Sequence, residues 1–330
     1  MSSASSAAPG PAPAIVAPFD VDALELVSRT RVRWPTAPGV LAETFAVPVE
    51  VLVGRARGPR VVLVAGVHGD ELEGILALHE LSRTLPVAEL AGTLVVIPVA
   101  NPPALVGLQR RVPIDGADLN RIFPGQPDGL FSDRLAAALF GWLQGADFLY
   151  SLHSWSAEGE VVPYLEFPGG DDPVARRSLE VGRLLGFDLL RTSAWHPGLL
   201  VAAANRAGVP AVEAEIGGLG IATPAGQKLY RATLANLLRA LDLMPGPPTP
   251  ADEVRIVRHV HVRANAGGLL LPDVELRQNV QLGDRLGVIV DLFGDPLAEV
   301  TAPIAGLVAA RRRANAIHVG DTTFTLFAAA

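Results

Sequence analysis

Apolar residues recur along the middle of the chain in two alternating patterns. Short runs rich in Val, Ile and Leu are typical of buried strands, and longer stretches with apolar residues three or four positions apart are typical of amphipathic helices. The predicted strands are 49–53, 61–65, 93–99, 148–152 and 209–216. The predicted helices are 71–85, 131–143, 173–185 and 224–241. This alternation predicts an α/β sheet with helices on both faces.

The pattern changes near residue 245. Segment 245–250, Pro-Gly-Pro-Pro-Thr-Pro, cannot continue a helix and predicts a stiff linker. Beyond it, short apolar runs separated by Gly, Asp and Pro predict a smaller all-β domain at 251–330. Its predicted strands are 254–262, 287–292, 298–302, 306–310 and 323–327. Residues 1–20 are rich in Ala, Ser and Pro and predict a disordered tail, which leaves 21–244 for the α/β domain.

Composition excludes several classes of function. The 330 residues carry a net charge of -7 with scattered charges, so we expect no basic face for nucleic acid. No apolar run approaches the roughly 18 residues of a membrane-spanning helix, so we expect no membrane partner. The N-terminus lacks the charged start and apolar centre of a signal peptide, and we expect a cytoplasmic location. Because the chain has no cysteine, any metal site has to use His, Asp or Glu.

Two histidines and a glutamate follow predicted strands and are the residue types of a catalytic zinc site. His68 and Glu71 lie three positions apart in segment 66–71, Gly-Val-His-Gly-Asp-Glu, directly after the strand at 61–65. His153 follows a second apolar run. Two imidazoles and one carboxylate, with a fourth position left open, form a ligand set of catalytic zinc. The carboxyl ends of neighbouring strands would bring these side chains together.

Two carboxylates near a third strand end are candidates for acid–base chemistry. Glu213 and Glu215 point to the same side of their strand because side chains alternate. A carboxylate beside a metal can take a proton from water and return it to a leaving amine. The alternative is that both glutamates are solvated edge residues or pair with arginines.

A further polar segment ends in an arginine and has two more arginines a few positions before it. Segment 118–121, Asp-Leu-Asn-Arg, follows Arg110 and Arg111. A guanidinium near a metal can bind a substrate carboxylate with two hydrogen bonds or polarise a scissile carbonyl. The alternative is that Asp118 and Arg121 form a surface pair or cap a helix.

The remaining histidines are given no metal role. His79 is predicted on a helix surface, and His318 lies in a late loop. His259 and His261 share one face of a predicted strand in the β domain and are interpreted as structural. His196 falls in a loop that could border the site, and its role is left open.

Taken together, these segments resemble the succinylglutamate desuccinylase/aspartoacylase family of zinc carboxypeptidase-like metallohydrolases. The resemblance extends from about residue 47 to the C-terminus. It implies a three-layer α/β/α catalytic domain with a smaller C-terminal all-β, barrel-sandwich-like domain that partly covers the site. The segments that carry it are 66–71, 101–102 (Asn-Pro), 118–125 (Asp-Leu-Asn-Arg-Ile-Phe-Pro-Gly), 152–154 (Leu-His-Ser) and 215–218 (Glu-Ile-Gly-Gly).

The family pattern assigns roles to individual residues. It implies one Zn²⁺ per chain, held by His68, Glu71 and His153. Glu215 matches the catalytic glutamate. The zinc site and this glutamate together imply a hydrolase of the aspartoacylase type.

Substrate contacts follow from the same resemblance. Asn120 and Arg121 match the pair that holds the substrate carboxylate. The arginine that polarises the scissile carbonyl falls at Arg110 or Arg111; spacing favours Arg110, which leaves Arg111 as a substrate contact. The chain departs from the family at Ser151, where the family usually has an acidic residue two positions before the third ligand.

The implied function is a zinc-dependent amide hydrolase, a deacylase that removes an acyl group from an N-acyl amino acid or similar small amide. A carboxypeptidase-like peptidase or an esterase is the alternative among hydrolases. A non-catalytic binding protein is the alternative outside them. The identity of the acyl group and of the amine stays open, as does the oligomeric state, a homo-oligomer included.

Segment 300–308 also resembles the biotinyl/lipoyl carrier fold. A carrier needs a lysine at a hairpin tip, which the sequence predicts at 293–296. The chain's lysine, Lys228, lies outside the β domain. We therefore predict a structural lid rather than a carrier.

Overall fold

The computed structural model describes residues 19–38, 44–193 and 196–330, so the tail predicted at 1–20 falls almost entirely outside the described residues. The strands of the α/β part are β1 (Ser28–Pro38), β2 (Thr44–Val53), β3 (Ala56–Ala65), β4 (Ala91–Ile97), β5 (Phe148–His153), β6 (Gly159–Pro168), β7 (Leu189–Ser193) and β8 (Ala211–Gly218). The helices are α1 (Leu72–Thr84), α2 (Pro102–Val106), α3 (Phe131–Gly141), α4 (Pro173–Gly182), α5 (Leu200–Arg206) and α6 (Pro224–Ala240), with 3₁₀ turns η1 (Val87–Glu89) and η2 (Leu119–Arg121). The later strands are β9 (Arg255–Arg263), β10 (Gly268–Pro272), β11 (Asn279–Val280), β12 (Arg285–Val290), β13 (Pro296–Thr301), β14 (Gly306–Arg312), β15 (Ala316–Ile317) and β16 (Thr322–Ala329).

One large sheet organises the protein. Its order is β1-β2-β4-β3-β5-β8-β6-β7-β9-β16-β14-β11. The central strands β4, β3, β5 and β8 are parallel, so the carboxyl ends of β3, β5 and β8 lie at the same edge. This edge carries the predicted site residues. The α/β alternation predicted from the sequence is confirmed, with strand and helix ends shifted by a few residues.

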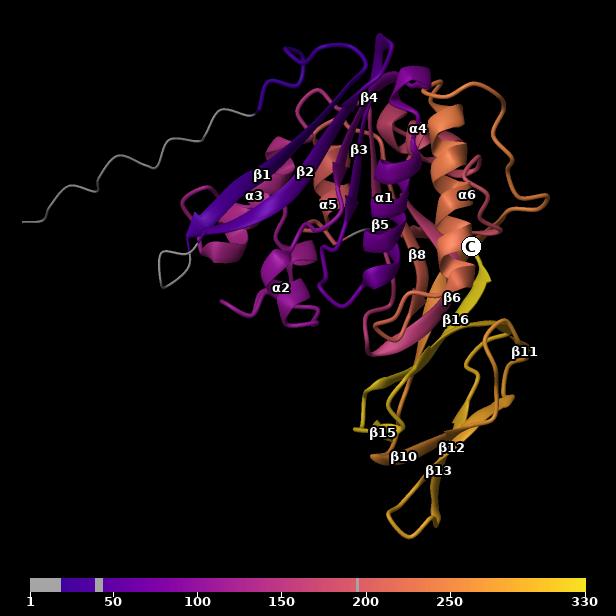
Figure 1. Ribbon diagram of the computed structural model, residues 1–330. Helices are drawn as coiled ribbons and strands as arrows, with labels where there is room; N and C mark the ends of the chain where they lie inside the picture. The colour runs from indigo at the N-terminus through magenta and orange to yellow at the C-terminus, as the bar shows by residue number, and fades with distance from the viewer. Residues whose placement is uncertain (1–18, 39–43, 194–195) are drawn as a thin grey trace, which may run out of the picture.

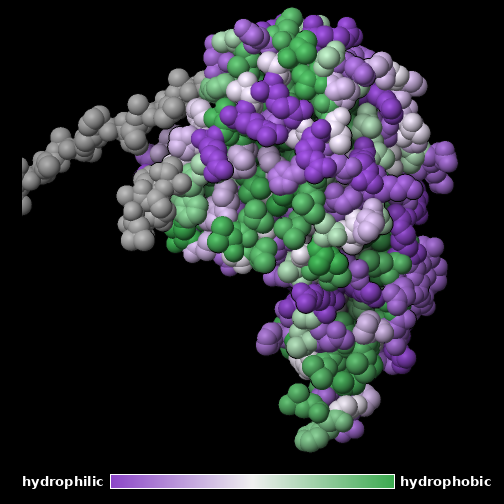
Figure 2. Space-filling view, viewed as in Figure 1, coloured by the Kyte–Doolittle hydropathy of each residue, from purple (hydrophilic) through white to green (hydrophobic). Residues whose placement is uncertain are grey.

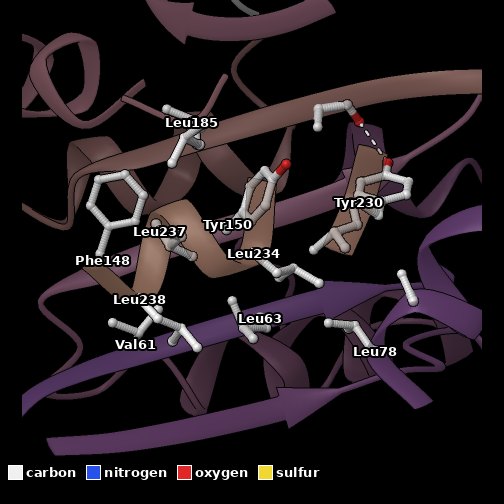
Figure 3. Packing of buried hydrophobic residues seen from close by; sticks show 14 of the residues in the cluster. Val61, Leu63, Leu78, Phe148, Tyr150, Leu185, Tyr230, Leu234, Leu237 and Leu238 are labelled. Carbon is white, nitrogen blue, oxygen red and sulfur yellow. Dashed lines mark hydrogen bonds between the residues drawn. The ribbon is translucent and has the colours of Figure 1, made fainter. Parts of the chain in front are cut away.

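Alternate residues of β3 face two separate hydrophobic clusters. Val62 and Val64 belong to a cluster that includes residues of α3 and α5. Val61 and Leu63 belong to a second cluster with residues of α1, α4 and α6. Figure 3 shows this second cluster, in which leucines of α6 lie beside the β3 residues and the aromatic rings of β5. Burial on both sides explains why β3 appears in the sequence as a continuous apolar run.

The C-terminal strands are hydrogen-bonded to the α/β part. β9 runs parallel to β7, with Arg191 opposite Val257, and β16 and β14 continue the sheet from β9. β14 also pairs with β6. The predicted linker is tied to α6, where the side chain of Asn236 bonds both backbone groups of Thr249. The domain boundaries proposed from the sequence stay predictions.

A second, four-stranded sheet lies at the far end of the molecule. Its order is β13-β12-β10-β15, and it lies at the end opposite the α/β part in Figure 1. The turn joining β12 to β13 is the hairpin tip predicted at 293–296. Leu292 and Phe293 are exposed at this tip, and Figure 2 shows apolar surface at that end. Among the described helices, none combines the length and apolarity needed to cross a membrane.

Candidate active site

Glu71 lies at the centre of a buried cluster with His68 and His153. The Nδ1 atom of His68 lies 2.7 Å from Oε1 of Glu71, and the Nδ1 atom of His153 lies 2.8 Å from Oε2. One ligand atom from each residue can be chosen so that all lie within 4.8 Å of one another. We call His68, Glu71 and His153 the ligand cluster.

The charges of the ligand cluster suit a divalent cation. Burial alone would raise the pKa of Glu71, but the two imidazoles lower it well below its usual value. Burial alone would lower the pKa of His153, but the carboxylates of Glu213 and Glu71 raise it to about 10. An ionised carboxylate between two imidazole nitrogens is a nitrogen and oxygen donor set that zinc prefers. The residues present therefore fit the metal that the sequence predicts.

The loop that carries His68 is fixed by its neighbours. The side chain of Asn101 donates to the backbone oxygen of Val67 at 3.0 Å and accepts from the backbone nitrogen of Ala104 at 3.3 Å, where it begins α2. At Gly69, a Cβ atom would lie 1.9 Å from the backbone carbon of Ala104. Only a glycine allows this approach, so α2 holds the loop against the end of β3.

A carboxylate stands behind His68. Oδ1 of Asp118 lies 3.1 Å from Nε2 of His68, and Oδ2 accepts from Nε of Arg110 at 3.0 Å. Asp118 also caps η2 by accepting from the backbone nitrogen of Asn120 at 3.0 Å. The sequence alternative of a helix cap is thus correct, and that of a surface pair with Arg121 is not, since Asp118 is buried and bonded to His68. Such a carboxylate orients a ligating imidazole.

Glu213 and Glu215 differ in their contacts although both lie on β8. Glu213 is 5% exposed and its Oε2 lies 3.4 Å from Nε2 of His153 and 3.2 Å from Nδ2 of Asn120. Oε2 of Glu215 is buried and has no hydrogen-bond partner among the described residues. Burial and the nearby Glu71 carboxylate raise the pKa of Glu215 well above its usual value. Glu215 is therefore the carboxylate with an unused acceptor.

Of the four polar residues predicted to contact substrate, three line the cavity and one does not. Arg110, Asn120 and Arg121 line a cavity at the ligand cluster, with the guanidinium of Arg110 3.6 Å from Oε1 of Glu71. Arg111 is exposed and bonds the backbone oxygen of Gly116 at 3.1 Å, outside the lining of that cavity. The geometry favours Arg110 as the arginine near the metal.

The cavity has a volume of about 580 Å³ and extends well beyond the predicted residues. It reaches from His68 and Glu215 to β9 and β16, so the C-terminal strands form part of its wall. His196, whose role the sequence left open, also lines it and accepts from the backbone nitrogen of Gly198 at 3.0 Å through Nδ1.

Several lining residues carry no local sequence signal. Tyr164 and Glu166 on β6 and Arg191 on β7 follow Glu213 and Glu215 across the sheet, and the Tyr164 hydroxyl donates to Glu166 at 3.0 Å. The interpretation of His259 and His261 as purely structural has to be corrected. Both line the cavity, with ring centroids 4.5 Å apart. Only the pairing of β7 with β9 brings them there. The polar lining residues from β6, β7 and β9 are Tyr164, Glu166, Arg191, His259 and His261.

Comparison with known proteins identifies relatives of the same architecture. Residues 57–243 match the family model described as succinylglutamate desuccinylase/aspartoacylase catalytic domain. The chain is 32% identical to the N-alpha-acetyl-L-2,4-diaminobutyric acid deacetylase of Halomonas elongata over 287 residues, 84% of each protein.

Two solved structures align over nearly their full length. A succinylglutamate desuccinylase/aspartoacylase from Rhodobacter sphaeroides has a TM-score of 0.86 at 26% identity, covering 94% of this chain and 98% of that one. The product-bound ectoine utilization protein EutE (DoeB) from Ruegeria pomeroyi has a TM-score of 0.85 at 25% identity, covering 91% and 95%. The fold resembles these proteins over both its α/β part and its β-rich part. The chain belongs to the succinylglutamate desuccinylase/aspartoacylase family.

Proposed function

We propose that the protein is a zinc-dependent amide hydrolase that removes an acyl group from an N-acyl amino acid or a similar small amide. The observation that carries the proposal is the buried ligand cluster, whose residue His68 lines the same cavity as Glu215. Membership of the family and the 32% identity to a deacetylase of an N-acetylated amino acid support the reaction class.

The ligand cluster would hold one zinc ion. His68 and His153 would bind through Nδ1, because these nitrogens face the carboxylate of Glu71. Bound zinc supplies a Lewis acid that polarises a carbonyl and makes water a better nucleophile near neutral pH.

Glu215 would move the protons of the reaction. Its carboxylate, with a free oxygen and a raised pKa, would take a proton from water as that water attacks the amide carbon. The protonated carboxyl would then donate this proton to the nitrogen of the leaving amine. One residue thus serves as base and then as acid.

The arginines would bind the charged parts of the substrate. Arg110 would donate to the carbonyl oxygen as negative charge develops on it, since its guanidinium already lies beside the ligand cluster. Arg121 would hold a substrate carboxylate together with Asn120, whose amide nitrogen has a second N–H beyond the one that it donates to Glu213. Arg111, which bonds the backbone of Gly116 and is not among the residues that line the cavity, is given no substrate contact.

The proposal also covers the domain architecture and the location of the protein. We infer a three-layer α/β/α catalytic domain with a C-terminal β domain whose strands wall the cavity and restrict it to small substrates. We also expect a cytoplasmic location and leave the oligomeric state open, a homo-oligomer included. A carboxypeptidase-like peptidase, an esterase and a non-catalytic binding protein remain the alternatives.

The Glu215→Gln variant tests the proposal. We expect it to bind zinc as the wild type does but to hydrolyse an N-acetyl amino acid at least about 10²-fold more slowly, the usual contribution of a general base. Zinc content and kcat are measured on the same preparation. A variant that retains wild-type turnover would contradict the assigned role, and turnover of zinc-free wild type would contradict the metal mechanism.

A further inference from the structure

The ring nitrogen of His153 that faces away from Glu71 has two oxygen neighbours. Ser151 Oγ lies 2.9 Å from Nε2, and Glu213 Oε2 lies 3.4 Å from it. Ser151 and Glu213 are direct partners in the parallel pairing of β5 with β8. If Nδ1 binds a metal, Nε2 carries the proton and needs an acceptor. The fold provides that acceptor from two adjacent strands.

Glu213 is itself held in place. Its Oε2 accepts from Nδ2 of Asn120 at 3.2 Å, and the amide oxygen of Asn120 accepts from the backbone nitrogen of Leu200 at 2.9 Å, where α5 begins. A chain of hydrogen bonds thus runs from the start of α5 through Asn120 to the carboxylate behind His153. Because Glu213 is 5% exposed, little water competes for its oxygens.

We propose that Glu213 is a positioning residue that fixes the tautomer and ring orientation of His153 for zinc. On β5 the corresponding position is a serine, Ser151, which has no carboxylate. Glu213, the direct partner of Ser151 on β8, supplies the carboxylate instead. The inference rests on the zinc site of the proposed function. A ligating imidazole usually donates its second N–H to a carboxylate or carbonyl, which raises its basicity and holds its orientation.

The same arrangement separates the roles of the two glutamates on β8. Glu213 uses Oε2 on His153 and Asn120, whereas Oε2 of Glu215 has no partner among the described residues. Glu213 therefore acts through His153 on the metal, and Glu215 acts on the substrate. Loss of Glu213 weakens zinc binding, and loss of Glu215 slows turnover of zinc-loaded enzyme.

Zinc affinity of the Glu213→Gln variant tests this division. The full-length metal-free protein is titrated with zinc against a chelating dye, and we expect the dissociation constant to rise about 10- to 100-fold. The Glu166→Gln variant is the matched control. Glu166 is the next residue across the sheet from Glu213, is equally buried and lines the same cavity, but within the described part of the chain its hydrogen bonds and ion pair are with Tyr164 and Arg191 and not with His153. Its zinc affinity should stay within about twofold of wild type.

A carboxylate moved to the opposite strand should rescue the loss. In the Ser151→Asp, Glu213→Gln double variant, the new carboxylate lies on β5 beside Nε2 of His153. We expect its zinc affinity to be at least tenfold higher than that of Glu213→Gln. Recovery identifies the carboxylate–imidazole contact as the cause, since general damage to the fold would not be repaired by a second substitution. Absence of recovery would overturn the inference.

Nitrogen-15 NMR of zinc-loaded wild type tests the tautomer without any substitution. The His153 ring should carry its proton on Nε2, and a ring protonated on Nδ1 would overturn the inference. If the wild type binds one zinc and Glu213→Gln binds it equally well, the inference fails while the proposed function stands. If the wild type binds no zinc, both fail together.

Discussion

The guanidinium of Arg110 lies 3.6 Å from the carboxylate of Glu71, although the two residues are far apart in the sequence. Asp118 holds Arg110 there, with its Oδ2 2.9 Å from Nη2 of Arg110, and the side chain of Arg110 remains 31% exposed. A cation that is anchored on one side and open on the other is suited to meet negative charge on a substrate. Arg111, the next residue, bonds the backbone of Gly116 instead.

This contrast makes adjacent arginines a matched pair for mutagenesis. We expect Arg110→Met to lower kcat/KM for an N-acyl amino acid about 10²- to 10³-fold, the usual cost of removing one donor to a developing oxyanion. Arg111→Met should stay within about twofold of wild type. Steady-state kinetics of both variants at saturating zinc provide the measurement, and a larger loss in Arg111→Met would reverse the assignment.

Gly69 is predicted to be essential to the loop that carries His68. In Gly69→Ala the new methyl group would lie 1.9 Å from the backbone carbon of Ala104, so either α2 or the loop has to move. We expect a loss of on the order of 3 kcal/mol in the free energy of unfolding. Zinc binding should weaken as well, because His68 is displaced.

Gly141→Ala is the control for this substitution. A Cβ at Gly141 has no atom within 4 Å, and the residue lies at the end of α3. Denaturant unfolding should show that Gly141→Ala is at least as stable as wild type, since alanine has a higher helix propensity than glycine. Equal stability of the two alanine variants would show that the close contact at Ala104 is relieved at no cost.

His259 should titrate far below its ordinary range. Burial and the nearby cation of Arg191 lower the pKa of His259 to about 4, from about 6.5 in an unfolded chain. The depressed pKa contributes stability that is present above pH 6.5 and is lost as the pH falls through 4. An NMR titration of the ring should give the low value. A pKa near 6.5 would mean that neither burial nor the charge of Arg191 acts on the ring.

The His259→Gln variant checks the consequence for stability. Its free energy of unfolding should fall less steeply than that of wild type between about pH 6.5 and pH 4, because glutamine takes up no proton. Unfolding by urea at several pH values in this window measures the difference. If the free energy of unfolding changed with pH equally steeply in the two proteins, the predicted effect of the His259 pKa on stability would be contradicted.

A small substrate should be preferred to a peptide or an ester. The cavity of about 580 Å³ is walled by β9 and β16, which leaves room for an N-acyl amino acid with its carboxylate on Arg121. We expect kcat/KM for an N-acetyl or N-succinyl amino acid to exceed that for a tripeptide or a matched ester at least tenfold. Faster cleavage of the peptide would support the carboxypeptidase-like alternative.

Much of the α/β part could be predicted because its pattern is local. Fully buried strands such as β3 and β5 form apolar runs, and α6 has the helical spacing of apolar residues. β1 was not predicted, since its sequence, rich in Arg, Thr and Pro, lies at the sheet edge and pairs only with β2. β6 was not predicted either, although it is mostly buried, because its glutamates and proline interrupt the apolar run.

The site residues likewise fall into those that the sequence predicts and those that it does not. His68, Glu71 and His153 are found from spacing after strands, and the structure brings them together. Tyr164 and His259 could not be found, because they reach the cavity only through the pairing of β6 with β8 and of β7 with β9. Such pairings join segments distant in the chain and leave no periodic signal. The contact between Glu213 and His153 likewise depends on the register of β5 against β8.

Zinc per chain tests the central claim most directly. Elemental analysis is carried out on protein purified without added metal and without a histidine tag. We predict about one zinc per chain in the wild type and little or none in His153→Ala, because two of three protein ligands do not hold a catalytic zinc firmly. A wild-type protein that contains no zinc and takes none up on incubation would contradict the account and favour a non-catalytic binding protein.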